Sequence, residues 1–150
     1  MPRLLVVHHT PSPATRELLE EVLAGAGLPE LVEVEVLVRP ALGAGVVDVL
    51  EADGYLLGTP ANFGYMSGAL KHFFDTVYYP CLDATAARPY GLWVHGNDDV
   101  AGAVRAVRAI AAGLGWAPVA RPLEITGAID AAAREACRDL GATLAATLLP

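Results

Sequence analysis

Short apolar runs alternate along the chain with longer segments of helical periodicity, and this alternation limits the fold more than any other feature of the sequence. The first run, Leu4–Val7, contains no polar residue, as expected for a strand that is covered on both faces. Ser12 and Pro13 then provide a cap and a first residue for a helix. The same order repeats, with further strands expected at residues 31–38, 55–58, 90–95 and 119–125, and helices expected at 45–51, after Ser67, after Asp98 or Asp99, and at 131–148. Five strand–helix units in series predict a parallel sheet with helices on both faces.

The second expected strand indicates the order of the sheet. Residues 31–38 alternate valines with Glu33 and Glu35, which is typical of a half-exposed strand at a sheet edge. This favours a three-layer α/β sandwich with a five-stranded parallel sheet of order 2-1-3-4-5. In that order the ligand site lies beyond the carboxyl ends of the strands, between strands 1 and 3. The loops after strands 1, 3 and 4 are therefore the expected functional loops.

Composition excludes several classes of protein. A chain of 150 residues fits one domain, 1–150, and its net charge of −7 provides no basic surface for nucleic acid. The apolar segments are too short or too often interrupted by charges to span a membrane. Cys81 and Cys137 form no CxxC pair, and Cys137 lies on the apolar face of a helix, where we expect a buried free thiol. We expect a cytoplasmic protein.

The first functional loop, Thr10–Thr15, combines three hydroxyl groups with the beginning of a helix. Hydroxyls and free amides at a helix N-terminus suit a phosphate monoester. An ordinary capped helix start explains the same residues equally well, so the loop by itself leaves both interpretations open.

The other two loops favour a flat heteroaromatic ligand. Thr59–Ser67 mixes the backbone-shaping Pro60 and Gly64 with the aromatic Phe63 and Tyr65. Such a loop offers both a stacking surface and backbone amides to a ring. The loop after the fourth strand, His95–Asp99, has a glycine for close backbone approach and more acidic side chains than helix capping requires.

Other sites are excluded by their motifs. The chain has no GxxxxGK[ST] sequence, no complete dinucleotide fingerprint and no GxSxG around Ser67. His8 and His9 point to opposite faces of a strand end and therefore cannot share a metal. One of them could lie near a bound ligand, but a hydrogen-bonded structural histidine is the favoured interpretation. Trp93, in the middle of the fourth strand, is expected in the core. We expect no catalytic side chain and no metal ligand.

The second loop also carries a resemblance to a known family. The stretch Gly58–Asp75, with Thr59-Pro60, Gly64 and Met66 before a helix, resembles the isoalloxazine loop of the flavodoxin and NAD(P)H-dependent FMN reductase group. The first loop is similar to the phosphate loop of flavodoxins, although Pro13 stands where that loop has glycine. The resemblance implies a flavodoxin-like fold and bound flavin mononucleotide (FMN).

By this resemblance each loop has a part of FMN to hold. The phosphate would lie against Thr10, Ser12, Pro13, Ala14 and Thr15. The isoalloxazine ring would lie against Pro60, Ala61, Asn62, Phe63 and Gly64. The other ring edge and the ribityl chain would meet His95, Gly96, Asn97 and Asp98.

The implied activity is an oxidoreductase that transfers electrons from NAD(P)H to a quinone or another small acceptor. The alternatives are a non-enzymatic electron carrier that docks with a redox partner protein, and a flavodoxin-like binding module that has lost FMN. Flavodoxin-like reductases often form dimers or tetramers, so a homodimer or homotetramer is compatible with the resemblance.

Overall fold

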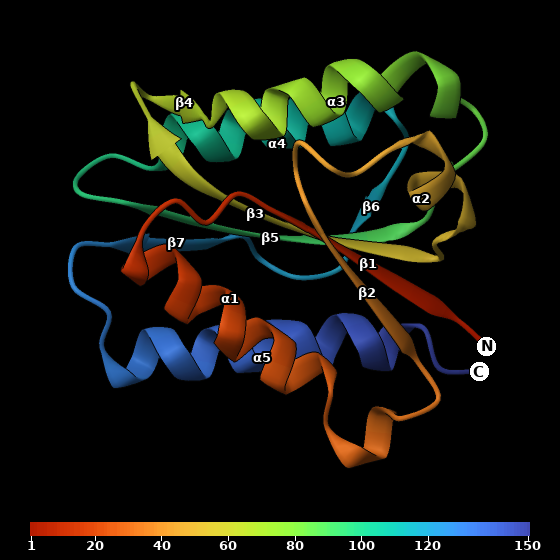
Figure 1. Ribbon diagram of the computed structural model, residues 1–150, viewed down its shortest axis with the longest axis horizontal. Helices are drawn as coiled ribbons and strands as arrows, with labels where there is room; N and C mark the ends of the chain where they lie inside the picture. The colour runs from red at the N-terminus through yellow and green to blue at the C-terminus, as the bar shows by residue number, and fades with distance from the viewer.

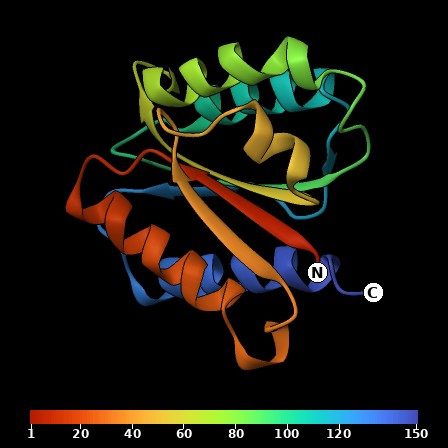
Figure 2. The same ribbon diagram turned by 45° about the vertical axis from the view of Figure 1, so that its right-hand side comes forward.

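The computed structural model describes residues 1–150 and shows one sheet between two layers of helices (Figures 1 and 2). The seven strands are β1 (Arg3–His8), β2 (Glu35–Pro40), β3 (Gly54–Asn62), β4 (Tyr65–Met66), β5 (Pro89–Gly96), β6 (Ala117–Pro118) and β7 (Leu123–Thr126). The helices are α1 (Pro13–Ala26), η1 (Pro29–Leu31, 3-10), α2 (Val46–Glu51), α3 (Gly68–Cys81), α4 (Ala101–Gly113) and α5 (Ala131–Thr147). No helix is long and apolar enough to cross a membrane.

The order of the parallel strands is β2-β1-β3-β5, followed by β6 and β7, which pair one after the other with successive parts of β5. The predicted order 2-1-3-4-5 is therefore confirmed, with β5 as the fourth strand and with β6 and β7 together in the fifth place. The short β4 is the one antiparallel addition, paired with the end of β3.

Each face of the sheet has its own apolar core. Helices α1 and α5 cover one face, and α2, α3 and α4 cover the other (Figures 1 and 2). Side chains of β1 alternate between the two cores, with Leu4 and Val6 on the α1–α5 side and Leu5 and Val7 on the other. This is why the first strand is apolar at every position.

Two expected strands differ from those observed. The second strand is β2, not residues 31–38, because Pro29 begins a 3-10 turn that includes Leu31 and leaves Val32 exposed. The fifth strand is interrupted between Pro118 and Pro122, which have no N–H to donate to the ladder. The edge position of β2 is confirmed.

Two sequence predictions about the core are confirmed. Trp93 is 2% exposed and lies over Gly58, where any side chain would collide with the indole ring. Cys137 is fully buried, and burial raises the pKa of its thiol to about 12, so the thiol remains protonated.

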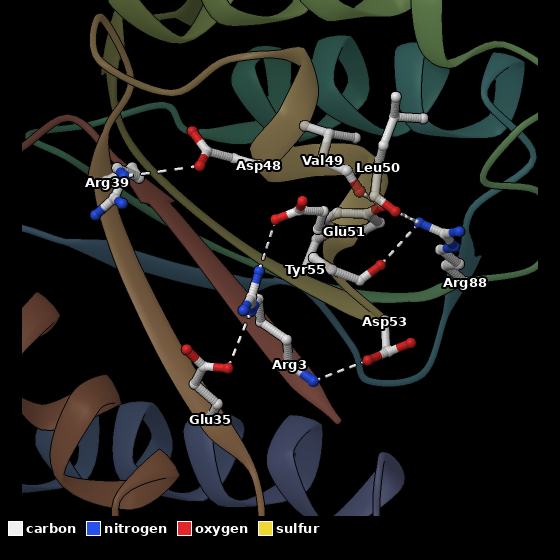
Figure 3. Close-up of polar contacts among 11 residues, drawn as sticks. Arg3, Glu35, Arg39, Asp48, Val49, Leu50, Glu51, Asp53, Tyr55 and Arg88 are labelled. Atoms are coloured by element: carbon white, nitrogen blue, oxygen red, sulfur yellow. Dashed lines mark hydrogen bonds and ion pairs between the residues drawn. The ribbon is translucent and has the colours of Figure 1, made fainter. Parts of the chain in front are cut away.

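Charged side chains hold the amino-terminal edge of the sheet together (Figure 3). The Arg3 guanidinium donates to Glu35 at 3.1 Å and to Glu51 at 2.9 Å, and the Arg3 backbone N–H donates to Asp53 at 2.8 Å. These contacts join β1 to β2, to the end of α2 and to the turn before β3.

Arg88 satisfies the carboxyl end of α2 from across this edge (Figure 3). Its Nη1 lies 2.9 Å from the carbonyl oxygen of Leu50 and 2.8 Å from that of Ala52, and it also reaches the Val49 carbonyl oxygen and the hydroxyl oxygen of Tyr55. The last carbonyl oxygens of a helix receive no hydrogen bond from an N–H group within the helix. Arg88 supplies the donors that these carbonyls lack.

We expect Arg88→Met to lower the free energy of unfolding by about 2 kcal/mol, because it removes charge-assisted hydrogen bonds and leaves partly buried carbonyls without donors. Urea denaturation measures the change. Arg105→Met, at an exposed α4 position, is the control and should leave stability nearly unchanged. Equal stability of the two variants would contradict the role of Arg88.

Candidate functional site

Four connections meet at the carboxyl-terminal edge of the parallel strands, on the left in Figure 1. They are the segment after β1, the β3–β4 turn, the segment after β5 and the segment after β7. The sequence analysis predicted three of them. It missed the fourth, residues 127–130, whose signal was Gly127 followed by the capping residue Asp130.

The first loop is organised around the start of α1. Ser12 caps the helix, as predicted, with its Oγ accepting the N–H of Thr15 at 3.2 Å. In return, Thr15 Oγ1 accepts the Ser12 N–H at 3.1 Å. Pro13 is the first helical residue and has no N–H, so the Ala14 amide is the first-turn donor without an intrachain partner.

The first loop has donors for an anion, but its hydroxyls are already engaged. Thr15 is 4% exposed, and Thr10 Oγ1 lies 3.2 Å from His8 Nδ1. Burial, and then the charge on His9, lowers the pKa of His8, which favours its neutral form. The exposed Arg16 lines a surface hollow of about 360 Å³ beside the helix start. Ser12, Glu17 and Glu20 also line this hollow, so two carboxylates offset the guanidinium there. A phosphate at the helix start itself would meet the free Ala14 amide and hydroxyls that can exchange partners.

The second loop is a β-hairpin rather than an irregular loop. β3 was expected to end at Gly58, but it continues to Asn62 because β5 pairs with it as far as Pro60 and β4 pairs with its last two residues. Phe63 and Gly64 make the turn with φ values of 52° and 73°. Positive φ at both central residues is the geometry that tight hairpins require.

The hairpin turn holds Phe63 in an unfavourable place. A bulky residue at positive φ is strained, and the Phe63 ring is 108% exposed, with no packing to offset the strain. Asn62 and Gly64 are exposed beside it, whereas Pro60 is buried in β3. The exposure and the positive φ of Phe63 are therefore not explained by folding stability.

Replacing Phe63 by Asn is expected to raise the free energy of unfolding by about 1 kcal/mol, because Asn-Gly is favoured in this type of turn. Thermal and urea denaturation check the gain. Phe63→Leu removes the ring and keeps the strain, so it should give no gain. A less stable Phe63→Asn variant would show that the ring contributes to the folded state.

The base of the hairpin is fixed by buried polar groups. Thr59 Oγ1 accepts the Ser67 N–H at 3.0 Å, and the same hydroxyl donates to the Pro60 carbonyl at 2.8 Å. Ser67 caps α3, as predicted, by accepting the Leu70 N–H at 3.2 Å. The hairpin is therefore joined to the start of α3.

Two glycines allow close contact between the hairpin and the segment from the end of β5 to the start of α4. A Cβ on Gly102, in the first turn of α4, would collide with the carbonyl oxygen of Gly64. A Cβ on Gly96 would lie 3.2 Å from that of Ala61. The absence of a side chain at Gly102 lets the hairpin turn pack against the start of α4, and its absence at Gly96 lets the ends of β3 and β5 pack together.

In the third loop, the N-cap residue of α4 differs from the expected one. Val100, not Asp98 or Asp99, is the N-cap residue of α4, although Asp99 Oδ1 accepts the Ala101 N–H at 2.9 Å. Asn97, Asp98 and Asp99 are all exposed, so this part of the edge is acidic.

His95 joins the third loop to the connection that sequence analysis missed. Its Nε2 donates to the Gly127 carbonyl oxygen at 2.7 Å, which fixes the tautomer with the proton on Nε2 in the neutral ring. The Gly127 N–H in turn donates to the Gly96 carbonyl oxygen at 2.9 Å. The structure thus brings all three predicted loops and residues 127–130 to one edge.

Comparison with known proteins identifies the family of the chain. Residues 14–128 match the model of the family described as NADPH-dependent FMN reductase. The chain belongs to the NADPH-dependent FMN reductase family. The matched residues include the second and third loops, as the resemblance of the second loop implied.

One curated relative matches part of the chain. A protein named flavodoxin from Aquifex aeolicus is 38% identical over 77 residues, which are 51% of this chain and 40% of that protein. The chain therefore matches less than half the length of this relative.

The solved structures show that this member of the reductase family has a flavodoxin-like fold. A flavodoxin from the domain Archaea superposes with a TM-score of 0.82 at 17% identity, covering 97% of this chain and 98% of the other. Flavodoxin 2 from Bacillus cereus gives 0.81 at 19% identity, covering 97% and 99%.

Proposed function

We propose that the chain binds FMN at the carboxyl-terminal edge and transfers electrons from NAD(P)H to a quinone or another small acceptor. The family match supports an oxidoreductase. The observation that carries the proposal is the pairing, on one edge, of a helix start that has a free amide with the exposed, strained Phe63.

The proposed contacts follow the three loops. The amide of Ala14 and the hydroxyls of Thr10, Ser12 and Thr15 would hold the phosphate, and Pro13 would shape that turn. The isoalloxazine ring would meet the hairpin, where Ala61, Asn62, Phe63 and Gly64 offer side chains and amides and the buried Pro60 fixes the backbone. His95, Gly96, Asn97 and Asp98 would line the other edge. FMN, when bound, supplies the redox chemistry, and the protein supplies position and electrostatics.

A non-enzymatic electron carrier is the second candidate function. The similarity to a protein named flavodoxin favours it, and the exposed acidic residues of the third loop offer a docking surface for a basic redox partner. A binding module without FMN is the third candidate function. It is supported by Pro13, which has no backbone N–H to donate to a phosphate.

The visible spectrum of the purified protein, after incubation with FMN and desalting, tests these candidates. Retained flavin absorption that bleaches under anaerobic NADPH or NADH supports the reductase. Retained flavin that bleaches only with dithionite supports the carrier, and protein that never retains FMN removes both.

Riboflavin is the matched control for the phosphate loop. FMN should bind much more tightly than riboflavin, because riboflavin has no phosphate for the start of α1. Ala14→Pro, which removes the free amide at a position where a helix tolerates proline, should narrow this difference. Equal affinities for FMN and riboflavin would contradict the proposed phosphate contacts. Size-exclusion chromatography tests the homodimer or homotetramer.

A further inference from the structure

A cavity lies between α3 and α4, which cover the same face of the sheet (Figures 1 and 2). Its volume is about 220 Å³. Its lining residues are Lys71, Phe74, Asp75, Tyr78 and Tyr79 of α3 and Ile110 of α4. None of them is among the predicted FMN contacts, and the two tyrosines lie about 15 Å along α3 from its start beside the hairpin.

Two neighbouring tyrosines form a corner at this cavity. The rings of Tyr78 and Tyr79 are nearly perpendicular, with an interplanar angle of 83° and centroids 5.2 Å apart. Tyr78 is held against α4, because its hydroxyl oxygen lies so close to Gly113 that a Cβ there would collide with it. Tyr79 is 80% exposed. Packing therefore explains the position of Tyr78 but not the exposed ring of Tyr79.

A carboxylate with a cation beside it also lines the cavity. Asp75 Oδ1 accepts a hydrogen bond from Lys71 Nζ at 2.7 Å, and this hydrogen bond raises the pKa of Lys71. The side chains of Lys71 and Asp75 are 40% and 64% exposed, and an exposed ion pair contributes little to stability. A ligand cation can therefore replace the Lys71 ammonium at Asp75 at little cost, because the lysine returns to water.

Two aromatic faces and a carboxylate together favour a positively charged ligand. The face of a tyrosine ring attracts a cation, and a cation in the corner between two perpendicular rings lies against both faces. A primary ammonium would exchange several hydrogen bonds with water for one carboxylate. A quaternary ammonium has no N–H group to satisfy, and its methyl groups can pack against the apolar side chain of Ile110.

We propose that this cavity binds a small free molecule that carries a trimethylammonium group. The methyl groups lie against Tyr78 and Tyr79, Asp75 balances the charge, and Ile110 closes the cavity from α4. The volume suits a ligand of this size and is too small for a large ring system. The site is separate from the proposed FMN contacts, so it stands or falls independently of the proposed redox function.

Titration of the ¹⁵N-labelled chain with choline tests the proposal. We expect saturable shifts of the amides in the second half of α3, with a dissociation constant on the order of millimolar for so small a ligand. Neohexanol has the shape of choline with an uncharged tert-butyl group, and it should bind roughly tenfold more weakly because it has no charge for the rings and the carboxylate. Equal binding of the two molecules, or no binding of choline, would overturn the proposal.

Variants of the exposed residues show which side chains hold the ligand. Tyr79→Leu removes the ring and should weaken choline binding about fivefold, whereas Tyr79→Phe keeps the aromatic face and should bind as the wild-type chain does. Asp75→Asn should also weaken binding, but Asp139→Asn, exposed on α5 across the sheet, should not. Lys71→Met should tighten binding about threefold, because it removes the competing ammonium. Unchanged affinity in both Tyr79→Leu and Asp75→Asn would overturn the assignment of the site.

Vesicles of phosphatidylcholine distinguish a free ligand from a lipid headgroup. The chain should not sediment with them, because the phosphate next to the headgroup ammonium would lie beside the Asp75 carboxylate. For the same reason phosphocholine should bind more weakly than choline. Sedimentation with the vesicles in the absence of binding to free choline would overturn the proposal of a small free ligand.

Discussion

Gly141→Ala is expected to lower the free energy of unfolding by about 3 kcal/mol, and the melting temperature by roughly 10 °C. Gly141 lies where α5 crosses α1, and a Cβ there would collide with the carbonyl oxygen of Val22. Gly25 makes the reciprocal approach, because its Cβ would collide with the carbonyl oxygen of Arg138. Both neighbours are backbone atoms, so the two helices must move apart to admit one methyl group.

This result would have the opposite sign from helix propensity, which favours Ala over Gly by about 1 kcal/mol in a helix. Gly68→Ala is the matched control, since Gly68 begins α3 and a Cβ there meets no atom within 4 Å. It should leave stability unchanged or slightly raised. If Gly141→Ala behaved like Gly68→Ala, close packing of α1 on α5 would not be a determinant of the fold.

The second large effect concerns the hairpin. Gly102→Ala is expected to raise the dissociation constant for FMN about 100-fold, which corresponds to the loss of two hydrogen bonds of ordinary strength. The new methyl group would collide with the Gly64 carbonyl and displace the turn that carries Phe63. Fluorescence titration with FMN measures the change, because bound and free flavin differ in emission.

The fold should survive this substitution, since the hairpin turn is exposed and lies at the margin of the core. Far-ultraviolet circular dichroism and the melting temperature check this, with Gly68→Ala again as the control. A variant that binds FMN as tightly as the wild-type chain would show that the hairpin position does not matter for the cofactor. A wild-type chain that binds no FMN would instead contradict the proposed function itself.

The sequence predicted the parts of the site that depend on local chemistry. Ser12 with Pro13, and Ser67 before α3, are capping residues whose hydrogen bonds span only three positions, so their patterns could be read directly. The third loop was less readable. Asp98 and Asp99 have the right chemistry for a cap, but the N-cap residue is Val100, whose side chain is buried in the core.

Contacts between distant segments could not be read from local pattern. Phe63-Gly64 does not carry the Asn-Gly signature of a tight hairpin, and the two-residue turn depends on β5 extending the pairing of β3. The bond from His95 to Gly127 joins residues 32 positions apart, so no local pattern placed the fourth connection next to the third loop. That His9 Nδ1 is buried without a hydrogen-bond partner likewise depends on its surroundings.

The sequence by itself determined the alternation of five strand regions with helices, the starts of α1 and α3 and the apolar surface for each core, because these depend on side-chain periodicity and on hydrogen bonds between near neighbours. The tertiary structure alone decided where β3 ends, how closely α1 approaches α5, and which loops share the carboxyl-terminal edge. Those features depend on distances between backbone atoms far apart in the chain, as at Gly141 and Val22 or at Gly102 and Gly64. A glycine looks the same in the sequence whether a Cβ in its place would face open space or another helix.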